Sequence, residues 1–293
     1  MENAGKPERG QRPLAEEIAE ARAPEDGFSV WFLSQNSFIL KDPRGTLVAI
    51  DPYLSDWCAT RGKSKERTSR SRLRPPLILP EELDVDLVLL THSHCDHADP
   101  ETLAVLASKG RVRCLCPHDA LLVARTAGFP EERLSLAHAG QEYVMEGEGG
   151  IRIRSTFALP TDGTDLNHLG FFIRFSGGAT FWDTGDSAWC DTLPSLSCAA
   201  LGAAPDVMAV CINAGYGNLS HWDASRLAGA AKARFAVPAH WDLFPHNRCD
   251  PFPFKISLER NAPDSVYAPM EEGVRYDFAG GVFAPAAKTG IVR

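Results

Sequence analysis

A run of metal-ligand side chains directly after an apolar strand constrains this chain more than any other feature. Residues 86–90 predict a buried strand, and the run that follows, Thr91-His-Ser-His-Cys-Asp-His97, has the pattern HxHxDH. Imidazoles and carboxylates are the usual ligands of zinc, manganese and iron, and a strand end holds side chains more rigidly than a free loop does. A polar turn with neighbouring histidines is the alternative, but ligand-type residues also follow other strands downstream. The run therefore predicts a metal site.

Two later strand ends deliver further ligand-type side chains. Asp186 follows a predicted strand at residues 180–182, and His240 follows one at residues 235–239. Gly185 would let the backbone turn sharply and approach a metal closely, and a carboxylate at position 186 can bridge two cations. Asp51, after a strand at residues 47–50, is placed to hydrogen-bond a ligand histidine. We expect these strand ends to converge.

Composition narrows the class of protein. The 293 residues are 44% hydrophobic, which suffices for a large core, and the formal net charge of −8 disfavours a nucleic-acid partner. The eight cysteines show no repeating spacing, the N-terminus lacks the apolar core of a signal peptide, and no apolar stretch approaches the roughly 18 to 20 residues of a membrane span. These features predict a cytoplasmic protein with reduced thiols and no membrane contact, and leave homo-oligomerisation open.

Residues 61–74 are basic, although the chain as a whole is acidic. This stretch contains a single acid, Glu66, and could be a solvated loop, which we favour, or an anion-binding segment. Its cations are Arg61, Lys63, Lys65, Arg67, Arg70, Arg72 and Arg74.

The order of predicted elements indicates an α/β sandwich. We expect residues 1–26 to be a polar N-terminal extension, with a short helical pattern at residues 14–21, and residues 27–293 to form a single domain. Closely spaced strands come first, and helices and strands alternate later, which favours an αββα arrangement of two sheets flanked by helices. Strands are predicted at residues 28–33, 37–40, 47–50, 87–90, 111–116, 151–159, 168–175, 180–182, 206–212 and 235–239, and helices at 100–106, 118–126 and 221–234.

With these motifs in place, the chain resembles the metallo-β-lactamase-fold superfamily. That superfamily shares an Asp after the third strand, the HxHxDH motif, a Gly-Asp turn and a final strand-end His, and the match spans roughly residues 28–250. Within it the chain is most similar to the L-ascorbate-6-phosphate lactonase group. The similarity rests on Asp51-Pro-Tyr-Leu-Ser-Asp56, the basic insertion before Arg74-Pro-Pro76, the Ser-Gly-Gly hairpin before Gly185-Asp186-Ser187, and Pro238-Ala-His-Trp-Asp242 with Asn247 and Asp250-Pro251.

The resemblance implies two divalent metal ions, manganese or zinc, in a fold of two mixed sheets. By position, His92 and His94 would hold one ion, and Asp186 would bridge it to the other. The ligands of the second ion would be Asp96, His97 and His240.

The chain departs from the superfamily at one ligand position. Phe157-Ala-Leu-Pro-Thr-Asp162 has no histidine where most members carry one. Either Asp162 supplies an oxygen ligand instead, or the first metal site is weak and the enzyme works with one ion. His168 is the nearest imidazole, but we expect it to be a strand residue satisfied by a neighbour. An oxygen-rich first site would shift the preference from zinc toward manganese.

Substrate contacts are also predicted. His221 lies near a loop that leaves a buried strand, and facing the substrate or facing away are equally compatible with its position. Arg72 and Arg74 could clamp a phosphate. The remaining histidines are expected at the surface: His118, His138 and His246.

The function implied by the resemblance is hydrolysis of a small-molecule lactone, with a phosphorylated sugar lactone as the best fit. A hydroxide generated at the metals would attack the carbonyl carbon, and Asp96 or a metal-bound water would return a proton to the leaving oxygen. Two alternatives stay open: a phosphodiesterase acting on a small cyclic or nucleotide ester, and a non-catalytic metal-binding sensor domain.

Overall fold

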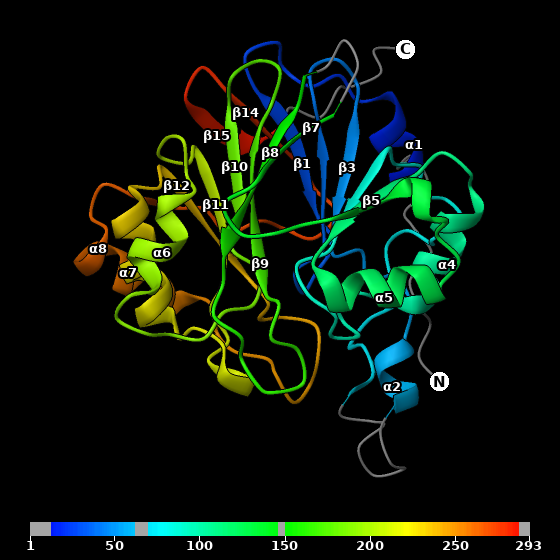
Figure 1. Cartoon of the computed structure of the whole chain (residues 1–293). Coiled ribbons are helices and arrows are strands. Elements are labelled where there is room, and N and C mark those ends of the chain that lie inside the picture. The colour runs from blue at the N-terminus through cyan, green and yellow to red at the C-terminus, as the bar shows by residue number, and fades with distance from the viewer. Residues whose placement is uncertain (1–12, 62–69, 146–149, 287–293) are drawn as a thin grey trace, which may run out of the picture.

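Two sheets packed face to face form the centre of the molecule (Figure 1). The structure is a computed structural model and describes residues 13–61, 70–145 and 150–286. The first sheet has the order β15-β14-β1-β2-β3-β4-β5-β6, antiparallel from β15 to β3 and parallel from β3 to β6. Its strands are β1 (Phe28–Phe32), β2 (Phe38–Lys41), β3 (Leu47–Ile50), β4 (Leu87–Leu89), β5 (Arg113–Cys116), β6 (Leu134–Leu136), β14 (Arg275–Ala279) and β15 (Val282–Pro285).

The second sheet is also mixed. Its order is β13-β12-β11-β10-β9-β8-β7, parallel from β13 to β10 and antiparallel from β10 to β7. Its strands are β7 (Glu142–Val144), β8 (Arg152–Phe157), β9 (Leu169–Arg174), β10 (Thr180–Asp183), β11 (Val207–Cys211), β12 (Phe235–Ala239) and β13 (Val266–Tyr267).

Helices cover the outer face of each sheet (Figure 1). The first sheet packs against α1, α4 and α5, and the second packs against α6, α7 and α8. The helices are α1 (Leu14–Glu20), α2 (Trp57–Arg61), α4 (Pro100–Ser108), α5 (His118–Thr126), α6 (Leu193–Ala199), α7 (His221–Ala231) and α8 (Phe252–Asn261), with 3-10 turns at Glu131–Arg133 and Gly215–Gly217.

Central strands are buried on both faces, which explains their uninterrupted apolar sequences. One face of each sheet contributes to an inter-sheet core in which Phe28 stacks on Phe175, and Phe38 packs against Phe181. The opposite faces meet the helices, so β1, β2, β3 and β11 contain only buried residues. Such two-sided burial is typical of sheets covered by helices. The predicted αββα sandwich is confirmed.

The N-terminal segment differs from the predicted polar extension. Residues 14–20 form the expected helix, but α1 packs on the first sheet through Ile18, of which only 3% is exposed. The Lys41 ammonium donates to the Ile18 and Ala19 carbonyls, and the Trp31 indole donates to Glu17. The bonds from Lys41 satisfy carbonyl groups in the last turn of α1, which have no partner within the helix. Together with the burial of Ile18, they make α1 part of the domain.

The helices of the described ranges are all short or polar. Within those ranges, no helix combines the length and the apolar character needed to cross a bilayer.

Candidate metal centre

Strand ends from both sheets meet at one edge, where the chain reverses direction. Asp51 and His240 adopt positive φ angles of 42° and 60° directly after β3 and β12, and Gly185 has φ 60° after β10. A Cβ atom on Gly185 would lie 2.5 Å from the Leu169 carbonyl oxygen and 2.9 Å from the Thr91 Cβ, so only glycine fits there. These reversals aim side chains from separate elements toward a common space.

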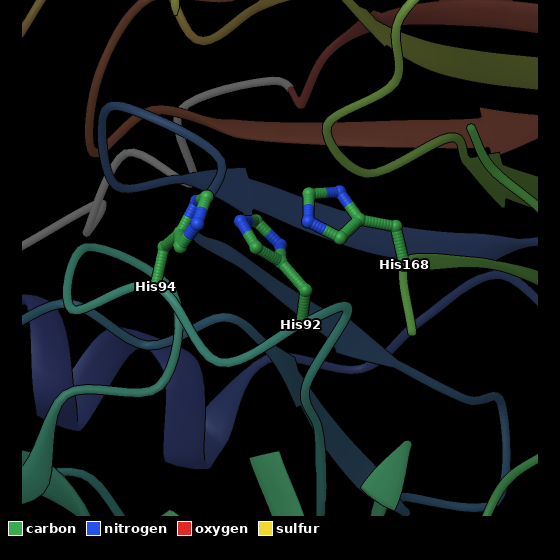
Figure 2. Close-up of side chains that lie close together, drawn as sticks. All are labelled: His92, His94 and His168. Carbon is green, nitrogen blue, oxygen red and sulfur yellow. The ribbon is translucent and has the colours of Figure 1, made fainter. Parts of the chain in front are cut away.

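Three histidines form a first donor group, which we define as His92, His94 and His168. One ring nitrogen from each lies within 4.8 Å of the others. Figure 2 shows the three rings grouped together, two from the HxHxDH run and one from the residue before β9. The ring centroids of His92 and His168 are 4.0 Å apart, and those of His92 and His94 are 4.5 Å apart.

The hydrogen bonds and pKa values of His92 and His168 favour neutral imidazoles. His168 Nδ1 donates to the Asp186 carbonyl oxygen at 3.0 Å, which leaves Nε2 as the lone-pair nitrogen. Burial lowers the pKa of His168, and burial with the charge of His97 lowers the pKa of His92 well below its ordinary value. The Nε2 atoms of His92 and His168 are buried and lack a hydrogen-bond partner in the described part of the chain. Both are therefore available to a cation.

The structure brings His168 rather than Asp162 into the first donor group, although the sequence predicted Asp162 as the ligand. Asp162 is 46% exposed, and its carboxylate accepts from the amide and hydroxyl of Thr164 at 2.7 Å, closing a local turn. It lies 3.6 Å from His94 Nε2 but belongs to none of the donor groups found in the described ranges. The loop then returns toward the HxHxDH run, where Asp165 accepts from the Ser93 amide, and this brings His168 into the first donor group.

A second donor group, which we define as Asp96, His97 and His240, lies beside the first. His97 Nε2 is 3.2 Å from His240 Nε2, and Asp96 Oδ2 is 3.3 Å from the same His240 atom. The Asp186 carboxylate connects the two groups because its donor atoms lie close to those of His92 and His97. Its Oδ2 is 3.2 Å from His240 Nε2, and its Oδ1 is buried without a partner among the described residues.

Charges in the second group stabilise one another in the absence of a metal. Burial opposes a charge on His97, but the surrounding carboxylates, Asp186 above all, raise its pKa well above the ordinary value. Burial likewise opposes ionisation of Asp96, but His97 and His240 lower its pKa. The carboxylates that favour a positive charge on these imidazoles would equally favour a bound cation, which would compete with protons for the same ring nitrogens.

Asp51 fixes the orientation of His97, as its position after β3 predicts. The Asp51 carboxylate is fully buried and accepts from His97 Nδ1 at 2.7 Å. It also accepts from the Thr91 amide and hydroxyl and from Asn36 Nδ2. A proton held on Nδ1 leaves the lone pair of His97 on Nε2, which lies beside Asp96 and His240 in the second donor group.

Three side chains near the centre were not identified from the sequence as site residues. Gln35 Nε2 donates to Asp96 Oδ2 at 2.8 Å and lies 2.8 Å from His240 Nε2. Asn218 Nδ2 donates to Asp186 Oδ2 at 2.8 Å. Their signal in the sequence is weak, since both lie in loops and neither belongs to a spaced motif.

The third missed residue is a buried acid. Asp183 Oδ1 accepts from the Gly185 amide and from Asn36, while Oδ2 has no partner within the part of the chain described. Burial and the nearby Asp51 charge raise the pKa of Asp183 to about 8. It precedes Asp186 by three residues, so the motif that predicted Asp186 also contained it.

The predicted substrate contacts have other partners. His221 begins α7, and its Nδ1 is 2.8 Å from Ser257 Oγ on α8, so this ring contacts the helix layer. Arg72 donates to the Tyr53 carbonyl at 2.6 Å, and Arg74 pairs with Asp242 and Glu272. Both guanidinium groups are thus paired with other residues of the chain.

The remaining sequence-based expectations concern the basic stretch and three histidines. Lys63, Lys65 and Arg67 lie outside the described residues. The surface positions predicted for the histidines are confirmed, since His118, His138 and His246 are all exposed.

The residues present fit divalent cations. Neutral imidazoles with unpartnered nitrogens, adjacent carboxylates and a buried carboxylate oxygen without a partner among the described residues match the usual ligands of zinc and of two-metal hydrolytic centres. An Asp–His hydrogen bond behind a ligand nitrogen is the usual means of orienting such a ligand.

Comparisons with known proteins agree with this geometry. The family model described as a beta-lactamase superfamily domain matches residues 46–241. A UPF0173 metal-dependent hydrolase of Anaeromyxobacter sp. is 26% identical over 260 residues, which cover 86% of this chain and 88% of the relative. A protein of the same name from Thermodesulfovibrio yellowstonii is 26% identical over 232 residues, covering 73% and 78%.

Solved structures share the fold. Igni18, a metallo hydrolase from Ignicoccus hospitalis, aligns with a TM-score of 0.64 and 21% identity over 86% of this chain and 100% of its own. An isothiocyanate hydrolase from Delia radicum gut bacteria aligns with a TM-score of 0.67 and 18% identity, covering 86% and 99%. Because the family model spans more than half of the 293 residues and includes every member of the two donor groups, the chain belongs to the metallo-β-lactamase superfamily.

Proposed function

We propose that this protein is a metal-dependent hydrolase acting on a small molecule. The observation that carries the proposal is the set of buried donor atoms without partners in the described part of the chain: His92 Nε2, His168 Nε2 and Asp186 Oδ1. Leaving polar atoms unpaired in the interior costs roughly 1–3 kcal/mol each, a cost that a bound cation removes. The relatives named as metal-dependent hydrolases support the same conclusion.

The donor set favours zinc over manganese at the first group. The manganese preference rested on an oxygen ligand at Asp162, whereas the structure brings His168 together with His92 and His94. Imidazole nitrogens suit zinc and iron better than manganese. Divalent cations at such a centre supply a nucleophile from water at neutral pH and polarise the bond to be cleaved.

The side chains of the centre have separable roles. Asp51 keeps the proton of His97 on Nδ1, and the Asp186 carbonyl does the same for His168. Gln35 donates to Asp96 and fixes the direction of its carboxylate. Asp96, whose side chain is 19% exposed against 6% for Asp186, is the proposed proton carrier to the leaving oxygen.

A lactone remains the proposed substrate class, without the phosphate. The phosphate depended on Arg72 and Arg74, and both have internal partners. The similarity to the lactonase group in the motifs around Asp51 and His240 supports a cyclic ester. The fold shared with an isothiocyanate hydrolase adds a carbon–nitrogen electrophile to the compounds worth testing.

The experiment is a substrate panel on protein of known metal content. Zinc-loaded protein would be assayed with simple lactones, a sugar lactone with and without phosphate, bis(p-nitrophenyl) phosphate and an aryl isothiocyanate. Faster turnover of lactones than of the phosphodiester supports the proposal, and the opposite order supports a phosphodiesterase. Bound metal without turnover of any compound would favour a sensor domain. Cytoplasmic location and the absence of a nucleic-acid partner stay predictions.

A further inference from the structure

Two cysteines from distant parts of the chain meet beside the second donor group. Cys58 lies on α2, and Cys95 lies inside the HxHxDH run between His94 and Asp96. Their Sγ atoms are 2.8 Å apart, although the residues are separated by 37 positions. Both are free thiols. A disulfide needs the sulfurs to approach to about 2.05 Å, so only a short movement separates this pair from a covalent bond.

The surroundings hold the pair together. Cys58 belongs to a small apolar cluster with Tyr53, Leu243 and Phe244, against which Cys95 packs. The Tyr53 hydroxyl accepts from the Cys58 amide at 3.2 Å, which anchors the start of α2. Neither thiol takes part in the donor groups as we have defined them.

The other close cysteine pair differs in kind. Cys114 and Cys116 have sulfurs 3.7 Å apart, but they sit on the same strand and are completely buried. Because they lie two residues apart along β5, a bond between them would link no separate elements. Cys95 is partly exposed, so an oxidant in solution can reach the pair at positions 58 and 95.

We propose that Cys58 and Cys95 form a reversible disulfide that weakens metal binding at the second donor group. Hydrogen peroxide is the oxidant class. The Cys95 sulfur, the more exposed, attacks the O–O bond and becomes a sulfenic acid with release of one water. The Cys58 thiol then attacks that sulfur, the S–O bond breaks, and a second water leaves. Two S–H bonds and one O–O bond are lost, one S–S bond and two O–H bonds form as the thiol protons pass to the two waters, and two electrons pass from sulfur to peroxide.

The position of Cys95 couples this reaction to the metal centre. Drawing the two sulfurs together takes several tenths of an ångström of movement, and Cys95 is covalently flanked by His94 and Asp96. Ligand positions tolerate displacements of about 0.5 Å. The disulfide therefore disturbs the Asp96 carboxylate, and a bound ion in turn opposes disulfide formation. This coupling rests on the proposed metal site, whereas formation of the disulfide does not.

A metal that binds the thiols directly is the competing explanation. Cys58, Cys95 and Asp96 do form a cluster of potential ligands. The Asp96 Oδ2 atom, however, already accepts from Gln35 and lies 3.3 Å from His240 Nε2. Two thiols without a further committed ligand are fewer than the four ligands of a structural zinc site.

The test uses the full-length protein, reduced and then treated with hydrogen peroxide. Peptide mapping without reduction should identify a Cys58–Cys95 cross-link within one chain, with loss of two of the eight thiols and recovery by dithiothreitol. Zinc affinity, measured by competition with a chelating dye, should fall roughly tenfold or more on oxidation, the size typical of disturbing the support of a metal ligand. Cross-links through other cysteines, or eight unchanged thiols, would refute the disulfide.

Variants separate the remaining outcomes. Cys58→Ser should trap Cys95 as a sulfenic acid that reacts with dimedone, while Cys198→Ser, a partly exposed cysteine on α6, should still form the cross-link. Reduced Cys58→Ser that has lost one zinc would overturn the proposal in favour of a thiol-bound metal. Reduced wild-type protein that binds no zinc refutes the metal site, and equal zinc affinity before and after cross-linking refutes the coupling alone.

Discussion

Replacing Asp51 by asparagine tests how the protein holds His97 ready for a metal. Asp51 is fully buried with φ 42°, a left-handed conformation that asparagine also tolerates, so the backbone has no reason to change. The side-chain oxygen of the introduced asparagine can still accept from the Thr91 amide. Its amide nitrogen, however, would replace the oxygen that now faces Asn36 Nδ2 and His97 Nδ1. His97 would then carry its proton on Nε2, the atom that faces the second donor group.

The expected magnitude follows from the lost charged hydrogen bond. Hydrogen bonds to charged groups contribute about 1.5–3 kcal/mol, which corresponds to roughly 10- to 150-fold in a binding constant. We expect zinc affinity at the second donor group to fall by that factor and affinity at the first group to change little. Calorimetric titration of zinc into the metal-free protein resolves the two classes of site.

A matched control exists in the same sheet. Asp42 is also completely buried, and it accepts from the Ser176 amide and hydroxyl and from the Arg44 amide, in the turn that joins β2 to β3. Asp42→Asn should lower the free energy of unfolding without changing zinc affinity. Equal zinc affinities for Asp51→Asn, Asp42→Asn and the wild type would refute the role given to Asp51.

Three further perturbations test other parts of the centre. His168→Ala should remove one zinc per chain by mass spectrometry under native conditions, whereas Asp162→Ala should retain it, and the reverse result would restore the sequence-based ligand. Gln35→Ala removes a donor to Asp96 and should weaken zinc at the second group, with an unchanged titration counting against that contact. Because the folded-state pKa of Asp183 is about 8 and its ordinary value is 3.8, the folded chain binds a proton that the unfolded chain lacks between these values, and stability falls as pH rises through that window. In urea denaturation of metal-free protein, Asp183→Asn should remove part of that decline, at most about 1.4 kcal/mol per pH unit, and parallel curves would contradict it.

Strand ends were predictable because their sequences carry strong local signals. The buried strands before Asp51, His92, Asp186 and His240 are short, and a ligand-type residue follows the end of each directly or after two further residues. The N-cap Asp99 with Pro100 likewise located α4, and Asp99 accepts from the Glu101 amide as an N-cap should. Local chemistry sufficed for these elements.

Contacts that depend on how loops return were not predictable. Asp162 and His168 lie in one loop before β9, and spacing alone does not show which of them faces the first donor group. Which of the two enters the group depends on how this loop is held, and the hydrogen bond from the Ser93 amide to Asp165 that holds it joins residues 72 positions apart. The role of Gln35, which has a left-handed φ of 57°, was equally unpredictable, because its partners come from distant parts of the chain: the end of β12 and the HxHxDH run.

The C-terminal strands were missed for a different reason. β14 and β15 are only partly buried, and Gly280 and Gly281 form the turn between them, so their apolar pattern is weak. They extend the first sheet through pairing of β14 with β1, from the opposite end of the chain. The packing of α1 on the first sheet likewise depends on contacts with residues far away in the sequence, such as Lys41, and the exposed side of this helix is polar.

A crystal structure of the zinc-loaded protein with anomalous diffraction at the zinc edge tests the central claim most directly. We predict one ion within about 2.0–2.1 Å of ring nitrogens of His92, His94 and His168, and a second ion bound by Asp96, His97 and His240, with Asp186 contacting both. An ion bound by Asp162 in place of His168 would contradict the assignment of the first donor group. Zinc found only outside both groups would contradict the metal-dependent mechanism itself.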